Sequence, residues 1–144
     1  MKRIEALAPL SREHHGSLIL AQLLKKDAPD YKGLPADSQG KAKYALEQYE
    51  ANIKDHFIKE EVILERVKGL HPEIARLTGE IINEHIELRA LFKSLSVTED
   101  LEETMNNLGN LLYDHIRKEE RVLFPLLQEH CTGEWLGAIN DLLH

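Results

Sequence analysis

Two segments of the sequence share one pattern of residues, DHFIKEEV at residues 55–62 and DHIRKEERV at residues 114–122. Both read D-H-x-x-K-E-E, so each places a histidine four residues before a glutamate. On an α-helix, residues at this spacing lie on the same face about one turn apart. Each segment therefore predicts a helix that directs an imidazole and a carboxylate to the same point.

The remaining sequence is also typical of helices, because apolar residues recur at spacings of three and four and no stretch alternates as a strand does. Proline and glycine divide the chain, and we expect helices over residues 11–26, 38–67, 72–95 and 99–124. The segment GEWLGAINDLLH, residues 133–144, predicts a short amphipathic helix. The expected fold class is all-α, an up-down-up-down four-helix bundle with a short C-terminal helix.

The helix ends have recognisable signals. Ser11 is the expected cap of the first helix, and Ser96 or Thr98 is the expected cap of the fourth. Pro125 should kink or end the fourth helix, because proline lacks the backbone N–H that helices use.

Composition limits the function classes. With 144 residues we expect a single domain over residues 1–144, and 42% apolar with 30% charged residues indicates a soluble globular protein. The net charge of −7 disfavours nucleic acid and anionic membranes as partners. Since the first residues form no apolar signal region, we expect a cytoplasmic protein. The single cysteine, Cys131, excludes an internal disulfide and a thiolate metal cage.

Every expected helix of the bundle supplies a histidine. His85 lies on the apolar stripe of the third helix, and the first helix offers His14 and His15. Buried carboxylates need a cation to remain charged, so the pattern predicts a metal site inside the bundle. The candidate ligands are His14, His15, His56, Glu60, His85, His115 and Glu119.

The other polar residues near this pattern have simpler interpretations. His71, His130 and His144 are expected to be surface groups. Glu61 and Glu120, the second acids of the two segments, are expected on solvated flanks, or as ligands if the helix register differs by one residue.

Imidazole and carboxylate donors without thiolate suit iron, manganese or zinc. Four histidines and two glutamates are more than one zinc needs, so two metals bridged by the glutamates fit better. The Glu-x-x-His pattern of ferritin-like proteins and the His-Glu-x-x-His pattern of zinc proteases are both absent from the sequence.

The order His, His-x-x-x-Glu, His, His-x-x-x-Glu resembles the hemerythrin-like, or HHE cation-binding, family. The segments that resemble it are LSREHHGSLILA, HFIKEEVIL, EHIELR and HIRKEERVLFPLL, which span residues 10–127. The resemblance implies two iron ions joined by an oxo or hydroxo bridge, with manganese or zinc as alternatives. It also implies terminal ligands at His56, His85 and His115, and bridging carboxylates at Glu60 and Glu119.

The family supplies one further histidine from the first helix. We favour His15, because Leu18 and Ile19 follow it at +3 and +4, as inward neighbours would. A helical wheel places His14 closer to the apolar residues, so both stay candidates.

One departure from the family affects function. Oxygen-carrying hemerythrins have a second histidine four residues from the first on the third helix, where this chain has Ile81 and Arg89. An open coordination position, or a substitute carboxylate such as Glu84, would follow. Arg89 is expected to reach solvent or to pair with an acid.

Three functions fit this pattern. The first is a di-iron protein that binds or senses dioxygen or a related small ligand, nitric oxide or peroxide. The second is a di-iron oxidoreductase that consumes peroxide or dioxygen, and the third is an iron-responsive interaction module. The sequence leaves open whether the protein is an enzyme and which oligomeric state it has.

Overall fold

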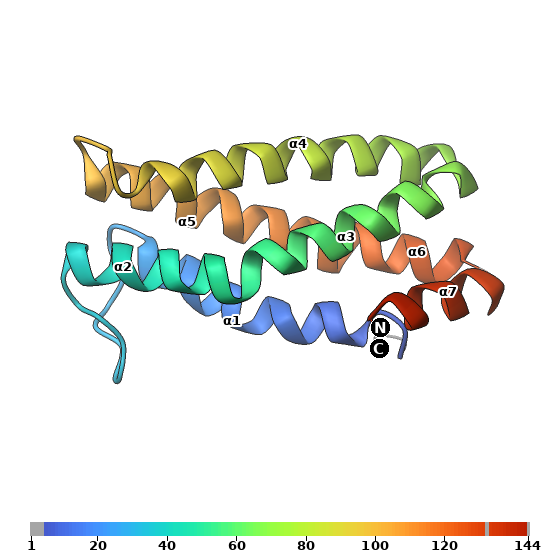
Figure 1. The fold of residues 1–144 in the computed structure, drawn as a ribbon, viewed down its shortest axis with the longest axis horizontal. Coiled ribbons are helices and arrows are strands. Elements are labelled where there is room, and N and C mark those ends of the chain that lie inside the picture. The colour runs from blue at the N-terminus through green and yellow to red at the C-terminus, as the bar shows by residue number, and fades with distance from the viewer. Residues whose placement is uncertain (1–4, 132, 144) are drawn as a thin grey trace.

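The computed structural model describes residues 5–131 and 133–143, and this part of the chain contains helices and no strand. Four long helical rods lie side by side and alternate in direction (Figure 1): α1, then α2 with α3, then α4, then α5 with α6. The last helix, α7, lies at the end of the bundle near Glu5 and Ala6 and contacts α3. The predicted all-α up-down-up-down bundle is therefore confirmed.

The bounds of the elements are α1 (Ala8–Leu24), α2 (Ser38–Gln48), the π-helix η1 (Tyr49–Ile53), α3 (Lys54–Val67), the 3-10 turn η2 (Lys68–Leu70), α4 (Pro72–Ser94), α5 (Leu101–Lys118), the π-helix η3 (Glu119–Leu123), α6 (Phe124–His130) and α7 (Gly133–Leu143). The rod of α2, η1 and α3 matches the predicted helix over residues 38–67. No helix of the described residues is long and apolar enough to cross a membrane.

Two expected helix caps are wrong. The first helix begins at Ala8, because Pro9 suits a first turn, and Ser11 lies inside the helix with its hydroxyl donating to Glu120 at 2.8 Å. Asp100, rather than Ser96 or Thr98, caps α5, and its carboxylate accepts from the backbone N–H of Glu103 at 3.2 Å.

Pro125 does not end the fourth rod, which continues as α6 to His130. The proline follows directly after η3, in the first turn of α6, where the loss of one backbone N–H costs little. The π-helix also shifts the register of this rod. Val122, three residues after Glu119, is consequently 47% exposed.

The apolar core consists of two clusters, one toward each end of the bundle. The first cluster is built around residues such as Leu20, Ala45 and Phe92, and the second around Leu10, Ile74 and Leu127. The buried polar residues His14, His56, Glu60, His85, His115 and Glu119 belong to neither cluster. The fold thus encloses a polar layer within its apolar core.

Candidate metal centre

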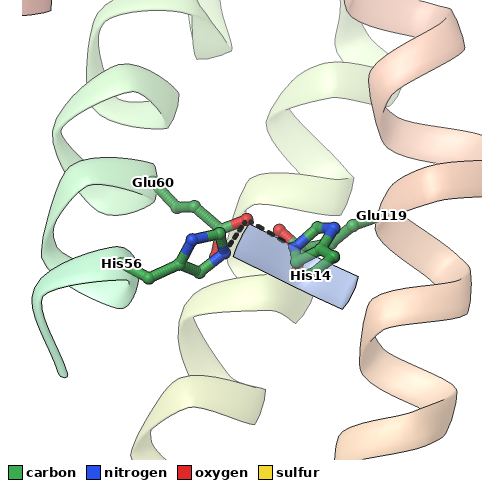
Figure 2. Close-up of side chains that lie close together, drawn as sticks. All are labelled: His14, His56, Glu60 and Glu119. Atoms are coloured by element: carbon green, nitrogen blue, oxygen red, sulfur yellow. Dashed lines mark ion pairs between the residues drawn. The ribbon is translucent and has the colours of Figure 1, made fainter. Parts of the chain in front are cut away.

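The buried polar residues form two donor groups that share both carboxylates. One group contains His14, His56, Glu60 and Glu119, and the other contains Glu60, His85, His115 and Glu119. Within each group the donor atoms lie within 4.8 Å of one another, and all the residues are buried. Figure 2 shows the first group, with His56 and Glu60 on α3, Glu119 at the start of η3 and His14 on α1.

The repeated segments supply the shared carboxylates, as the four-residue spacing predicts. The Nε2 atom of His56 lies 3.3 Å from Oε2 of Glu60, and the Nε2 atom of His115 lies 2.9 Å from Oε1 of Glu119. The other oxygen of Glu60, Oε1, lies 3.2 Å from Nε2 of His85. Glu60 therefore faces both donor groups with different oxygens, which is the arrangement of a bridging carboxylate.

His14 completes the site from the first helix. Its Nε2 atom lies 3.4 Å from Oε1 of Glu119 and 3.6 Å from Oε2 of Glu60. The ring stacks on Phe124, with 5.6 Å between the ring centroids. His14 therefore contacts both shared carboxylates, and packing against an aromatic ring fixes its orientation.

The donor atoms fit a bound cation. Both oxygens of Glu60 and of Glu119, and the Nε2 atoms of His14, His56, His85 and His115, are buried and have no hydrogen-bond partner with adequate geometry among the described residues. Proteins normally satisfy such atoms, because an unpaired buried carboxylate is costly. A cation between them would compensate both charges at once.

A second layer of carboxylates lies behind the histidines. The Nδ1 atom of each histidine faces an acid on a neighbouring rod: His14 faces Glu120 at 3.7 Å, His56 faces Glu13 at 3.5 Å, His85 faces Glu61 at 2.6 Å, and His115 faces Glu84 at 2.7 Å. We call Glu13, Glu61, Glu84 and Glu120 the outer carboxylates. They connect the rods in a closed cycle. A carboxylate on α1 faces a histidine on α3, one on α3 faces α4, one on α4 faces α5, and one on η3 faces α1.

The protonation of the metal-free site follows from its charges. Burial would lower the pKa of His56, but Glu60 and Glu13 raise it to about 9. Burial likewise opposes charging of His115, but Glu119 and Glu84 raise its pKa to about 10. Burial would raise the pKa of Glu60, yet His56 and its other partners hold it well below its usual range. Protons on the imidazoles therefore balance the buried carboxylates when no metal is bound.

The preference for His15 over His14 is wrong. The side chain of His15 is exposed and belongs to neither donor group, whereas His14 is buried. Of the neighbours that favoured His15, Ile19 is 40% exposed, and only Leu18 packs, partly buried, against the first apolar cluster. The better signal was the buried stripe of Leu10, His14 and Ala21, at spacings of four and seven.

The place of the missing histidine contains no substitute ligand. Ile81 is fully buried in the apolar core, and Arg89 pairs with Glu61 at 2.8 Å, as expected for an arginine near acids. Glu84 does not replace the histidine either, because it accepts from Nδ1 of His115 and from Lys118. The second donor group therefore has two imidazoles, like the first.

Sequence reasoning missed the outer carboxylates. Glu61 and Glu120 were expected on solvated flanks, yet each is partly buried and faces the histidine of a neighbouring helix. A usable signal was present, because Glu13 and Glu84 directly precede His14 and His85 in the sequence.

The remaining histidines and Tyr49 lie elsewhere. The rings of His71 and His130 stack on each other at a centroid distance of 4.2 Å, and Nδ1 of His71 accepts from the backbone N–H of Glu73 at the start of α4. His144 lies outside the described residues. Tyr49 stacks on Phe92 in the first apolar cluster.

A small cavity adjoins the two shared carboxylates. Its volume is about 10 Å³, and it is lined by Glu60, Glu119, Leu7, Leu10, Ile63, Leu64, Leu123, Phe124 and Leu127. This volume corresponds to about one water molecule. The cavity has apolar walls apart from the carboxylates themselves, so a ligand there would meet the shared donors directly.

Comparison with known proteins adds one finding. A family profile described as the hemerythrin HHE cation binding domain matches residues 5–127. Searches of curated proteins and of solved structures found no significant match. The match includes all six residues of the two donor groups, and it ends before α7.

Proposed function

Because the chain belongs to the hemerythrin HHE cation-binding domain family, we propose that it binds two iron ions between its helices and uses them to bind or sense a small ligand. The ligand would be dioxygen or a related molecule, nitric oxide or peroxide. The proposal joins a property of the family, cation binding, to the geometry and size of this particular site.

The observation that supports two ions is the sharing of Glu60 and Glu119 by both donor groups. One ion would lie beside His14 and His56 and the other beside His85 and His115, with the carboxylates between them. Nitrogen and oxygen donors without thiolate suit iron, and manganese or zinc are the alternatives. Two ferrous ions held there would supply electrons and open coordination positions for the ligand.

The size of the cavity favours a ligand of two or three atoms. A volume of about 10 Å³ leaves no space for an organic substrate unless side chains move. The leucine and phenylalanine walls exclude water, which would slow irreversible oxidation of the ions. The chain's own contribution is therefore to fix the donor atoms and to keep the ligand site dry.

A second candidate function is a di-iron oxidoreductase that consumes peroxide or dioxygen. The observation that favours it is the position of Ile81 and Arg89, which leave the α4/α5 group with only two imidazoles. An ion with fewer protein ligands has more positions for a reacting molecule. Stopped-flow spectroscopy of the reduced protein with oxygen separates the two functions, because a reversible charge-transfer band supports binding and turnover supports an enzyme.

Elemental analysis after anaerobic iron loading tests the proposal itself. We expect about two metal equivalents per chain, and almost none in the double variant Glu60→Ala with Glu119→Ala. His130→Ala and His15→Ala are matched controls that should keep both equivalents. One equivalent or fewer in the unmodified chain would reject the two-ion site, and unchanged loading of the double variant would show that other residues bind the metal.

A further inference from the structure

The two donor groups are alike on the side that faces the carboxylates but differ on the outer side. The Nδ1–H groups of His85 and His115 donate short hydrogen bonds to Glu61 and Glu84, at 2.6 and 2.7 Å. Both ring nitrogens of His14 and of His56 lack a hydrogen-bond partner with adequate geometry among the described residues. The rings of His85 and His115 are thus held by hydrogen bonds at Nδ1, whereas His14 is positioned by its stacking on Phe124 and His56 by packing alone.

Cations contact the two carboxylates that make these hydrogen bonds. Arg89 pairs with Glu61 at 2.8 Å, and its guanidinium lies 5.6 Å from the ring centroid of Phe57, which in turn stacks on His85 at 4.1 Å. Lys118 pairs with Glu84 and also with Glu80. Each carboxylate that holds a histidine of this group is therefore itself fixed by a cation.

On the other side, Glu120 accepts from the hydroxyl of Ser11, and Glu13 is 34% exposed and lies 3.5 Å from His56. These contacts are longer at the histidine than those of Glu61 and Glu84. The carboxylates are present around all four histidines, but only one pair makes hydrogen bonds that fix the rings.

A fixed Nδ1–H group determines the ring orientation, so Nε2 already faces the site and becomes the donor atom when the metal displaces its proton. Metal binding to such donors therefore has a smaller free-energy cost for ordering the side chains. The charges of Arg89 and Lys118 act in the opposite direction, because they repel a dication. Each cation is paired with a carboxylate and is partly exposed, so the carboxylate and the solvent offset its repulsion.

We propose that the two ion positions fill in a fixed order, first between His85 and His115 and then between His14 and His56, with Arg89 and Lys118 as the positioning residues that set this order. The inference rests on the proposed function only in requiring that the chain binds two ions. It makes the α1/α3 position the exchangeable one, which gains and loses its ion while the other stays filled.

NMR of the metal-free chain, labelled with ¹⁵N at histidine and titrated with Zn²⁺, tests the order directly. The ring nitrogens report each position separately, and single His→Ala variants assign the signals. At one equivalent we expect the signals of His85 and His115 to shift while those of His14 and His56 stay in place. The second equivalent should shift the remaining pair.

Arg89→Gln and Lys118→Gln test the positioning role. Loss of a group that contacts a ligand directly typically lowers metal affinity about 10- to 100-fold, so for these cations, one contact further out, we expect the first step to weaken by about 10-fold and to approach the second. Arg89→Lys should restore part of the difference. Lys68→Gln is the matched control, because it removes an exposed cation paired with Glu65 at 2.7 Å, outside both donor groups, and should change neither step.

The outcomes are distinguishable. Simultaneous shifts of all four histidines in the unmodified chain, or earlier shifts of His14 and His56, would overturn the order. An unchanged first step in both Arg89→Gln and Lys118→Gln would overturn the positioning role. The absence of any shift at these four histidines would instead reject the proposed metal site, whatever its order.

Discussion

The two copies of the D-H-x-x-K-E-E segment differ in backbone conformation although their residues match. The first copy lies within α3, whereas the second leaves α5 and enters the π-helix η3 at Glu119 itself. The histidine and the first glutamate of both copies are buried and belong to the donor groups. Three residues after each glutamate the copies diverge, since Ile63 is 2% exposed and Val122 is 47% exposed. The histidine and the glutamate thus occupy matching positions in both copies, although the backbone after them differs.

The largest expected effect tests whether the two copies are equivalent in metal binding. Glu60→Ala and Glu119→Ala should each lose most of both ions, because each carboxylate belongs to both donor groups. His14→Ala should lose about one ion, since His14 belongs to one group. Inductively coupled plasma mass spectrometry of iron-loaded samples measures the content. A loss of one ion in Glu60→Ala and of two in Glu119→Ala would show that only the π-helical copy bridges.

The second largest expected effect is a loss of stability when the metal is removed. A ligand at about 100 times its Kd stabilises the folded state by about 2.7 kcal/mol. For a chain of this size that corresponds to a fall in Tm of about 5–10 °C when the metal is removed. Calorimetry of loaded and chelated samples measures the difference. Glu60→Ala and Glu119→Ala should melt at the same temperature with and without iron, and a persistent difference would indicate binding elsewhere.

The metal-free protein should depend on pH through one histidine of each copy. The pKa values of His56 and His115 rise in the folded state from 6.5 to about 9 and about 10. A raised pKa contributes stability that is fully present below pH 6.5 and is lost as the pH rises through the folded value. Urea unfolding of the metal-free chain should therefore show decreasing stability from about pH 6.5 to 10.

The metal-loaded protein is the control for this pH dependence, because bound metal replaces the protons. Its stability should change less over the same range. His115→Ala should reduce the slope near pH 10 and His56→Ala near pH 9. A metal-free chain with constant stability between pH 6.5 and 10 would contradict the charge balance described for the site.

The exposed histidine of the first helix should have almost no effect. His15→Ala is expected to keep both ions and to change the unfolding free energy by less than about 0.5 kcal/mol, as surface substitutions usually do. The same substitution at the adjacent position, His14→Ala, is the contrast, because His14 is buried against Phe124. Loss of metal in His15→Ala but not in His14→Ala would reverse the assignment of the first helix.

Much of the fold and most of the donor residues could be predicted from the sequence, because both depend on regular helical spacing. The rod over residues 38–67 and the pairs His56/Glu60 and His115/Glu119 follow from a period of 3.6 residues. The predictions that were wrong concern features that this period does not determine. His14 and His15 are adjacent, and Leu10 shares a buried stripe with His14 only because the helix begins at Ala8, one turn earlier than Ser11 suggested.

The outer carboxylates could not be predicted because they act between helices. Glu61 and Glu120 lie about 100° from the donor glutamates on a helical wheel, which suggests solvent when each helix is considered alone. Their partners, His85 and His14, belong to other rods, and the rotation of those rods is a tertiary property. The interpretation of the segments as pairs of donors was therefore incomplete, since each also supports a neighbour.

The smallest expected effect separates the two copies after their glutamates. Val122→Ala should change the unfolding free energy by less than about 0.5 kcal/mol, because its side chain is already half exposed and alanine suits helices. Ile63→Ala, at the matching position of the first copy, should cost about 2–5 kcal/mol because it leaves a cavity in the second apolar cluster. Urea unfolding of the two metal-free variants measures both unfolding free energies. Equal costs would mean that Val122 is buried like Ile63, which requires a regular α-helix through residue 122 and would remove the π-helix that distinguishes the two copies.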